Sequence, residues 1–282
     1  MLFPDENQVQ IDGTVIRYLT AGSGSPLVLL HAGGESARDW EWIIPSLAGK
    51  YRIIAPDLHY CCNGNGNSNG SSARHMADLV SKFLRALGVE EAVVVGNSLG
   101  GLIALHITLA GLFRATGLVL VSSAGLGREI TPLMLGMTMP VISDLTVMWG
   151  TTPIGAMQRA IVKAPVLFSR LQRIPCRWLM DQYRLAQLPN FLTATLNSMR
   201  AQIDPGGQRE VLLDELRQIE LPTLVVWGAD DRVIPVEHAR RAMERLPHGT
   251  LEIIPDCGHL PQIEQWTLFT AKLMRFLDTL SA

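Results

Sequence analysis

The sequence predicts an α/β protein in which helices cover both faces of a mostly parallel sheet and a helical cap is inserted. Three observations lead to this prediction. Short apolar runs, typical of strands buried on both faces, alternate with longer stretches of helical periodicity. This alternation stops between residues 127 and 218, where helical periodicity continues without such a run. The chain has 282 residues, 48% of them hydrophobic, which is enough for one large domain or a core with an insertion.

The elements follow one another in a regular order. Residues 9–22 alternate in polarity around Asp12-Gly13, which predicts a β-hairpin. Six apolar runs predict the strands 27–32, 51–57, 91–97, 117–123, 223–229 and 250–256. Helical periodicity predicts helices over roughly 37–48, 72–88, 99–111, 236–246 and 262–280. Strands that alternate with helices in this way predict a parallel central sheet.

The interruption of this pattern predicts the domain organisation. We expect a core of residues 1–126 and 219–282 and a helical cap, or lid, of residues 127–218. The most apolar part of the cap, 132–149, contains Pro140 and Asp144 and is barely long enough to cross a bilayer. A helical cap segment is therefore expected there, without stable insertion into a membrane. The Gly- and Asn-rich stretch 63–70 is expected to be a flexible loop of the core.

Composition excludes several functional classes. The formal net charge is −2 and there is no basic stripe, so we expect no nucleic-acid partner. The first residues lack the charged and apolar regions of a secretory signal, so a cytoplasmic location is expected. The four cysteines match no zinc spacing, and neither a metal nor a cofactor is expected. The expected oligomeric state is a monomer or a homodimer.

One serine stands out in 92-AVVVGNSLGGLIALHI-107. Ser98 follows an apolar strand and precedes a helix, and glycines occupy positions 96, 100 and 101. A G-x-S-x-G sequence in this context is typical of a nucleophile elbow, in which small neighbours let strand and helix approach closely. The N–H of Leu99 at the helix start is then a candidate oxyanion donor. The alternative is a glycine-rich turn whose serine only caps the helix.

A serine nucleophile needs a base and an orienting carboxylate. His259, in 255-PDCGHLP-261, lies between the last strand and the last helix and is the predicted base. The stretch 227-WGADDRVIP-235 offers two adjacent carboxylates that point in different directions. Asp231 is the predicted triad acid, although the sequence alone leaves Asp230 as an alternative. Three other histidines are expected to be solvated on or beside helices: His75, His238 and His248.

A second oxyanion donor is predicted after the first parallel strand, in 31-HAGGES-36. Gly33 and Gly34 permit close approach of the backbone to a substrate oxygen, and one of their amides would donate to it. Taken alone this motif is weak, because glycines after a strand usually form only a turn.

Together, these motifs resemble those of the α/β-hydrolase superfamily over nearly the whole chain. The matching motifs are HAGG (31–34), GNSLGG (96–101), GADDRVIP (228–235) and CGH (257–259). The resemblance implies the α/β-hydrolase fold with Ser98 as nucleophile, Asp231 as acid and His259 as base. It also implies that the amides of Gly33 and Leu99 form the oxyanion hole.

Within the superfamily, GNSLGG and 124-AGLG-127 resemble the carbon–carbon bond hydrolases of aromatic meta-cleavage pathways. Asn97 matches that group's residue beside the nucleophile. The chain departs from the group at Leu260, where a tryptophan is usual, and at Trp42, where a substrate-binding asparagine is usual. The loop 57-DLHYCCNGNGNS-68 also departs from the usual superfamily pattern and carries two adjacent cysteines, Cys61 and Cys62.

These considerations predict a serine carboxylesterase for small or medium apolar esters. The predicted substrate-binding residues are Gly34, Trp42, Asn97, Met137, Trp149 and Leu260. The alternatives are a carbon–carbon bond hydrolase and a ligand-binding, receptor-like protein with little turnover. The cap also carries a run of cations that we expect to be a solvated helix face, or alternatively an attractor for a carboxylated substrate: Arg159, Lys163, Arg170, Arg173, Arg177 and Arg184.

Overall fold

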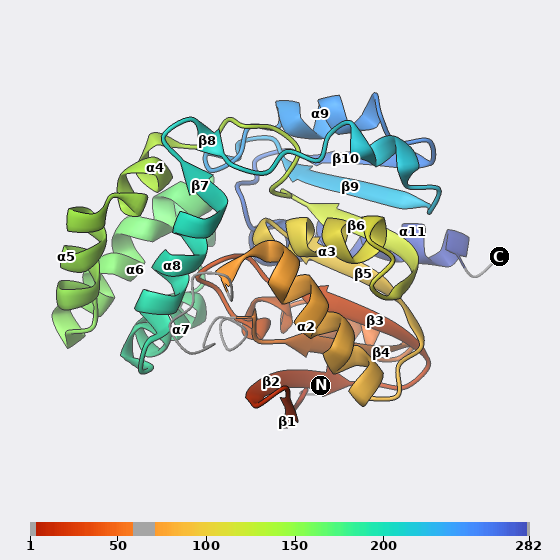
Figure 1. Ribbon diagram of the computed structural model, residues 1–282, viewed down its shortest axis with the longest axis horizontal. Coiled ribbons are helices and arrows are strands. Elements are labelled where there is room, and N and C mark those ends of the chain that lie inside the picture. Colours follow the sequence, from red (N-terminus) through yellow and green to blue (C-terminus); the bar gives the residue numbers. More distant parts are fainter. Residues whose placement is uncertain (1–3, 59–70, 281–282) are drawn as a thin grey trace.

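The structure, a computed structural model, describes residues 4–58 and 71–280. An eight-stranded sheet with the order β1-β2-β4-β3-β5-β6-β9-β10 forms the centre of the molecule (Figure 1). Its strands are β1 (Asp5–Ile11), β2 (Thr14–Ala21), β3 (Ser25–Leu30), β4 (Tyr51–Pro56), β5 (Glu91–Asn97), β6 (Arg114–Val121), β9 (Thr223–Gly228) and β10 (Gly249–Ile254). β1 pairs with β2, and β2 with β4, in antiparallel fashion, and the other neighbours are parallel. The mostly parallel sheet is thus confirmed, and each predicted strand is present within a few residues of its expected position.

The predicted hairpin closes with a two-residue turn. Ile11 pairs with Thr14, and the intervening Asp12 and Gly13 have φ angles of 48° and 80°. Positive φ at both central positions is typical of the tight turns that match the twist of antiparallel strands. β1 begins earlier than expected, at Asp5, because its first four residues are polar and exposed and give no apolar signal.

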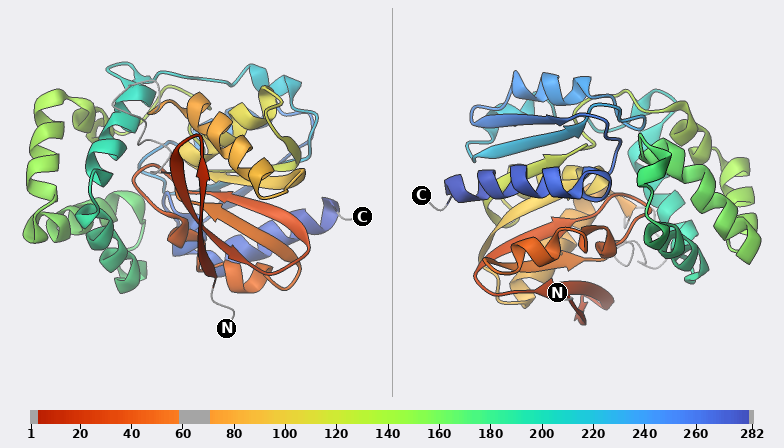
Figure 2. Two further views of the ribbon diagram at one scale, coloured as in Figure 1. Left: turned by 60° about the horizontal axis from the view of Figure 1, so that its bottom comes forward. Right: turned by 180° about the vertical axis from the view of Figure 1, so that it is seen from behind.

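Two apolar layers cover the two faces of the sheet, and neighbouring residues of one strand contribute to different layers. Val94 belongs to the layer beneath α2 (Ala73–Ala86), α3 (Leu99–Leu109) and α9 (Glu237–Met243). Val95 belongs to the layer that contains Trp40 and Phe269, beneath η1 (Ala37–Trp40), α1 (Ile44–Leu47) and α11 (Trp266–Leu280). The view from behind in Figure 2 shows α11 crossing the face opposite α2 and α3. This alternation explains why the central strands are apolar throughout.

Two predicted helices are divided in the structure. The segment 37–48 consists of the 3₁₀-helix η1, capped by Ser36, and the short α1, which has Pro45 in its first turn. The segment 262–280 begins as α10 (Pro261–Glu264) and continues as α11. Proline fits the first turn of a helix, where its missing N–H removes no hydrogen bond, and both α1 and α10 have a proline in their first turn.

The chain between β6 and β9 is mainly helical, and Figure 1 shows the helices labelled α4 to α8 gathered beside the sheet. Its helices are α4 (Pro132–Thr138), α5 (Pro140–Gly150), α6 (Pro153–Leu167), η4 (Leu171–Arg173), α7 (Cys176–Gln187), α8 (Phe191–Gln202) and η5 (Glu215–Gln218). A small hairpin of β7 (Ile203–Asp204) and β8 (Gly207–Gln208) forms a second sheet, too short to produce an apolar run.

The most apolar part of this segment forms two helices at a sharp angle. Within the described residues, no single helix is long and apolar enough to cross a membrane. In the described part of the chain, one pair of helices, residues 132–138 and 141–150, reaches that length and composition when taken together, and the two are bent by 88°.

Candidate active site

Ser98 lies at the junction of β5 and α3 in a strained backbone conformation. Its φ and ψ angles are 53° and −114°, although it is not a glycine. Positive φ values are uncommon for residues with a Cβ and mark positions where the surrounding structure imposes the conformation. The N–H of Ser98 donates to the carbonyl of Val121 on β6 at 2.9 Å, which fixes the turn against the neighbouring strand.

The surrounding glycines are required by close backbone contacts. A Cβ added to Gly96 would lie 2.2 Å from the carbonyl oxygen of Gly100. One added to Gly100 would lie 2.2 Å from the carbonyl oxygen of Leu30 on β3. Strand β5, helix α3 and strand β3 therefore meet at distances that no side chain permits, and the serine is held at their junction.

Asp231 and His259 come from the loops that follow β9 and β10. Oδ2 of Asp231 lies 2.8 Å from Nδ1 of His259, and both side chains are buried. Asp230, the alternative carboxylate, is exposed, and its N–H donates to the carbonyl of Cys257 at 2.9 Å. Of the two adjacent carboxylates, the geometry places Asp231 at the histidine.

Asn97, predicted as a substrate contact, is buried beneath the site. Its Nδ2 donates to the carbonyls of Val121 at 3.0 Å and His259 at 3.2 Å, and its Oδ1 accepts from Gln262 at 3.1 Å. The side chain therefore ties the elbow strand to the backbone of His259. We correct the prediction accordingly, because these bonds occupy the amide group.

The loop after β3 lies beside Leu99, the residue that follows Ser98. A Cβ on Gly33 would lie 3.5 Å from the Leu99 side chain, so the two predicted oxyanion residues are neighbours. The ring of His31 supports this loop: Nε2 accepts from the N–H of Leu58 at 2.8 Å and Nδ1 lies 2.7 Å from the carbonyl of Ala32. Because a backbone N–H can only donate, Nδ1 carries the proton of the neutral ring.

A cavity of about 80 Å³ contains these groups. Ser98, His259, Gly33 and Leu99 all belong to its wall. Most of the remaining wall is apolar, and it includes residues from both the core and the inserted segment. These are Ala32, Glu35, Ala124, Ile130, Met134, Lys163, Leu167, Ser198, Met199, Gln202, Ile203, Gln208, Val233 and Ile234.

The other predicted substrate contacts lie outside this wall. Trp149 is 53% exposed on α5 and donates to Gln158 at 3.0 Å. Trp42 is half-buried against the two apolar layers, and Leu260 is fully buried. Met137 is half-buried on α4, where Met134, one turn earlier, lines the cavity instead.

A buried polar cluster joins the inserted segment to the loop after β3. Nζ of Lys163 on α6 donates to the carbonyl of Gly34 at 2.9 Å, to Gln182 at 2.9 Å and to Glu35. The other Glu35 oxygen accepts from Gln182 at 2.7 Å and from Trp178 at 3.2 Å. Lys163 is therefore not part of a solvated face, which corrects the prediction.

Burial perturbs the titration of this cluster. It lowers the pKa of Lys163, and the nearby Glu35 opposes that effect. Burial and the adjacent Glu35 charge raise the pKa of Asp39 well above its ordinary value. Arg159 is also placed here, with a pKa lowered by burial, and its Nε and Nη2 are buried without a hydrogen-bond partner among the described residues.

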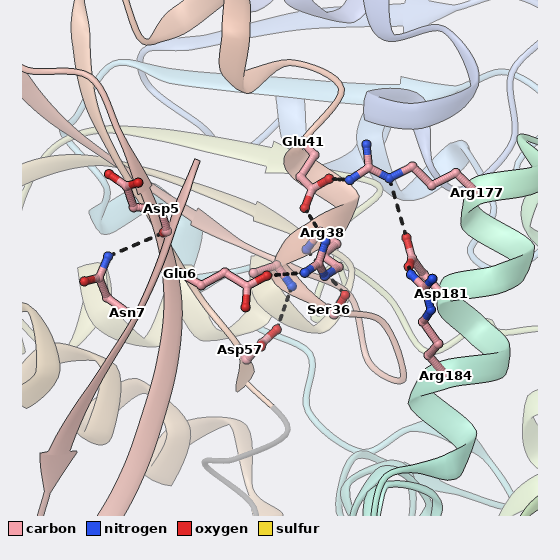
Figure 3. Close-up of polar contacts among 11 residues, drawn as sticks. Asp5, Glu6, Asn7, Ser36, Arg38, Glu41, Asp57, Arg177, Asp181 and Arg184 are labelled. Atoms are coloured by element: carbon pink, nitrogen blue, oxygen red, sulfur yellow. Dashed lines mark hydrogen bonds and ion pairs between the residues drawn. The ribbon is translucent and has the colours of Figure 1, made fainter. Parts of the chain in front are cut away.

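The other four cations of the predicted run are exposed, as predicted: Arg170, Arg173, Arg177 and Arg184. Figure 3 shows Arg177 of α7 paired with Glu41, which also accepts from Arg38 at 2.9 Å. A cavity of about 440 Å³ lies beside Arg38, between β1, β2, η1 and α7, and its wall includes neither Ser98 nor His259. We therefore place the candidate chemistry in the smaller cavity.

The structure also tests the expected solvation of three histidines. His75 and His248 are exposed, as predicted. His238 is fully buried and lies 2.9 Å from Glu129, so its predicted solvation is wrong. Cys61, Cys62 and the loop 63–70 lie outside the described residues.

Comparisons with known proteins agree with this architecture. The profile described as "Alpha/beta hydrolase family" matches residues 27–272. A 2-hydroxy-6-oxo-6-(2'-aminophenyl)hexa-2,4-dienoic acid hydrolase of Metapseudomonas resinovorans is 32% identical, over 97% of this chain and 91% of that protein.

Two solved structures are similar over nearly their full lengths. A serine hydrolase involved in carbazole degradation has 28% identity and a TM-score of 0.78, over 98% of this chain and 99% of that one. An N-acyl homoserine lactone degrading enzyme has 28% identity and a TM-score of 0.72, over 96% of this chain and 100% of that one. With the matched profile, the sheet order and the strained serine junction in agreement, the chain belongs to the α/β-hydrolase family.

Proposed function

We propose that this hydrolase cleaves carboxylic esters of small to medium, uncharged apolar compounds through Ser98, His259 and Asp231. The observation that carries the proposal is the shared cavity: Ser98 and His259 belong to one mostly apolar wall, and Asp231 holds the imidazole from behind. We further propose that residues 127–218 act as a cap, because Met134, Leu167 and Met199 of that segment close the cavity.

In the proposed reaction, Oγ of Ser98 attacks the ester carbonyl while its proton passes to Nε2 of His259. The N–H groups of Gly33 and Leu99 donate to the oxyanion that forms. The imidazolium then gives its proton to the departing alkoxide, and an acyl-enzyme remains. His259 next removes a proton from water, which attacks the acyl group and releases the acid and the serine.

Asp231 is proposed to keep the proton of neutral His259 on Nδ1 and to stabilise the imidazolium. Its second oxygen accepts from the N–H groups of Val233 and Ile234, so the carboxylate has a fixed orientation. No residue of the proposed reaction requires a metal or an organic cofactor.

A carbon–carbon bond hydrolase is the second candidate, favoured by the 32% identical dienoic acid hydrolase. Such a substrate carries a carboxylate that needs a cationic partner. Among the described residues of the cavity wall, Lys163 is the one lysine or arginine, and its three donors already serve Gly34, Glu35 and Gln182. This arrangement favours an uncharged ester over a dienoate.

Two measurements test the proposal. A fluorophosphonate should label the wild-type protein and leave the Ser98→Ala variant unlabelled, as read by intact mass. Aryl acetate, butyrate and octanoate should be hydrolysed faster than a ring-fission dienoate. An unlabelled wild type would favour a binding protein, and much faster turnover of the dienoate would favour the carbon–carbon bond hydrolase.

A further inference from the structure

Glu264 lies at the end of α10, five residues after His259, and its carboxylate is almost completely buried. One oxygen, Oε2, accepts from the N–H of Gly258 at 2.7 Å. The other, Oε1, accepts from the N–H of Arg170 at 2.9 Å and from Oγ of Ser169 at 3.0 Å. The N–H of Ser169 is within 2.9 Å and 3.1 Å of the two oxygens.

These donors come from two segments that are distant in sequence. Gly258 immediately precedes His259 on the loop after β10, whereas Ser169 and Arg170 follow α6 in the inserted segment. Glu264 therefore connects the histidine loop to the inserted segment. Each donor is an N–H or O–H group, so a carboxylate with acceptors on both oxygens is the matching partner.

The inserted segment also contacts the histidine loop directly. The N–H of His259 donates to the carbonyl of Leu167 at 2.8 Å. A Cβ on Gly258 would lie 2.4 Å from the same carbonyl oxygen. On the outer side, Arg170 pairs with Asp256, and Arg173 donates to the carbonyl of Asp256 at 2.6 Å. The segment around residues 167–173 thus lies against the loop that carries the imidazole.

We propose that Glu264 is a positioning residue for His259. It acts through hydrogen bonds that hold the segment after α6 against the histidine loop. This inference rests on the proposed function in that it assigns His259 as the base. The His259 backbone is then fixed from two sides, by Leu167 at its N–H and by Asn97 at its carbonyl. Glu264 keeps the Leu167 carbonyl in place at the His259 N–H, so that the imidazole is positioned to bond to both Asp231 and the serine.

The Glu264→Gln variant tests the inference, because an amide keeps the shape of the side chain but offers an acceptor on one side only. Its NH₂ group must face either Gly258 N–H or the donors of Ser169 and Arg170. A small displacement of a catalytic group costs up to about 100-fold in rate. We expect fluorophosphonate labelling and kcat to fall together by roughly 10- to 100-fold, with KM nearly unchanged.

The matched control is Glu252→Gln. Glu252 is a partly buried carboxylate on β10 that pairs with Lys272, and among the described residues its side chain makes no hydrogen bond or ion pair with the histidine loop. The control should keep wild-type rates. Equal losses in both variants would overturn the inference, since they would reflect a general loss of stability.

A proton NMR measurement supplies a readout that does not depend on turnover. The Nδ1–H proton of His259, bonded to Asp231, is expected in the downfield region. In Glu264→Gln this resonance should shift and exchange faster with water, and in Glu252→Gln it should not change. A folded Glu264→Gln variant with wild-type labelling and an unchanged resonance would contradict the inference.

The two proposals fail in different ways. If wild type is not labelled but the resonance responds to Glu264→Gln, the proposed function fails and the positioning role is supported.

If Glu264→Gln does not fold, Ser169→Ala removes one donor from the same carboxylate and keeps the backbone. That variant should label about three-fold more slowly, as expected from one hydrogen bond. Wild-type labelling of Ser169→Ala would then overturn the inference.

Discussion

Oδ2 of Asp231 lies 2.8 Å from Nδ1 of His259, while Oδ1 of the same carboxylate accepts from two backbone N–H groups. These donors belong to Val233 at 2.8 Å and Ile234 at 3.1 Å. With Oδ1 occupied by groups that can only donate, Oδ2 is the oxygen available to the imidazole. A proton on Nδ1 satisfies that oxygen and leaves the lone pair of neutral His259 on Nε2.

The Asp231→Asn variant should fold and lose most of the activity. Its amide oxygen would be held by the N–H groups of Val233 and Ile234, so that its NH₂ group would face Nδ1 of His259. The ring would then carry its proton on Nε2, the wrong tautomer for a base. A loss on the order of 10⁴-fold in kcat is expected from this kind of change, with little change in thermal stability.

The adjacent Asp230→Asn variant is the matched control, since Asp230 is an exposed carboxylate one position earlier. It should keep nearly wild-type kcat in the same assay. A larger loss in Asp230→Asn than in Asp231→Asn would show that the neighbouring carboxylate has the proposed role.

The serine junction predicts a difference between two glycines. In Gly100→Ala the new methyl group would lie 2.2 Å from the carbonyl oxygen of Leu30, and moving it would shift α3 against β3. We expect a loss of about 1–3 kcal/mol in the free energy of unfolding, measured by urea denaturation. Gly49→Ala, where a Cβ would meet nothing within 4 Å, should show no such loss. Equal stabilities would indicate that the junction relaxes without cost.

The serine junction could be predicted from the sequence because its determinants are local. Gly96, Ser98 and Gly100 lie within five positions, between an apolar strand and an apolar helix. His259 and Asp231 could also be predicted from the sequence. Each follows a strand of the parallel sheet, and the loops after parallel strands lie at the same edge of the sheet.

Other determinants depend on partners that the sequence does not connect. Lys163 pairs with Glu35 across 128 positions, and Ser169 bonds to Glu264 across 95. From the sequence alone, a lysine on a helix is expected to be solvated, because its buried partner is not known. The same is true of His238. The residues of the cavity wall could not be predicted for a related reason. Whether Met134 or Met137 of α4 lines the cavity depends on how the helices pack.

The Lys163→Met variant should be strongly destabilised. It would leave the fully buried Glu35 without its cation, and removal of one partner from a buried pair costs about 3–5 kcal/mol. The double variant Lys163→Met/Glu35→Gln should recover part of this loss, because the uncompensated charge is removed. Lys50→Met, at an exposed pair with Asp278, should change the free energy of unfolding by less than about 1 kcal/mol. Failure of the double variant to recover would argue against charge burial as the cause.

The buried His238 predicts how stability depends on pH. Nε2 lies 2.9 Å from Glu129, and Nδ1 is buried with no hydrogen-bond partner in the described part of the chain. A protonated ring would place a second N–H there without an acceptor. Burial accordingly lowers the pKa of His238 below the usual 6.5, even though Glu129 opposes the shift.

The direction of the effect follows from the difference between the folded and unfolded states. Below about pH 6.5 the unfolded chain takes up a proton at His238 that the folded protein excludes, so the free energy of unfolding falls as the pH falls. Glu129 acts in a lower range, because a hydrogen bond from Arg241 holds its pKa at about 2. The stabilisation from Glu129 is complete above its ordinary pKa of 4.5 and is lost only below it.

Urea denaturation between about pH 7.5 and 5.5 should therefore separate the effect of His238 from that of Glu129. In His238→Gln the side-chain NH₂ group can still donate to Glu129 but does not titrate, so the free energy of unfolding should fall less steeply with pH than in wild type. Each unit by which burial lowers the pKa is worth about 1.4 kcal/mol of this difference. His75→Gln, at an exposed histidine of α2, should keep the wild-type slope. If His238→Gln retained the wild-type slope, His238 would not be excluding a proton in the folded state, and its contact with Glu129 would have to be one between two charged groups.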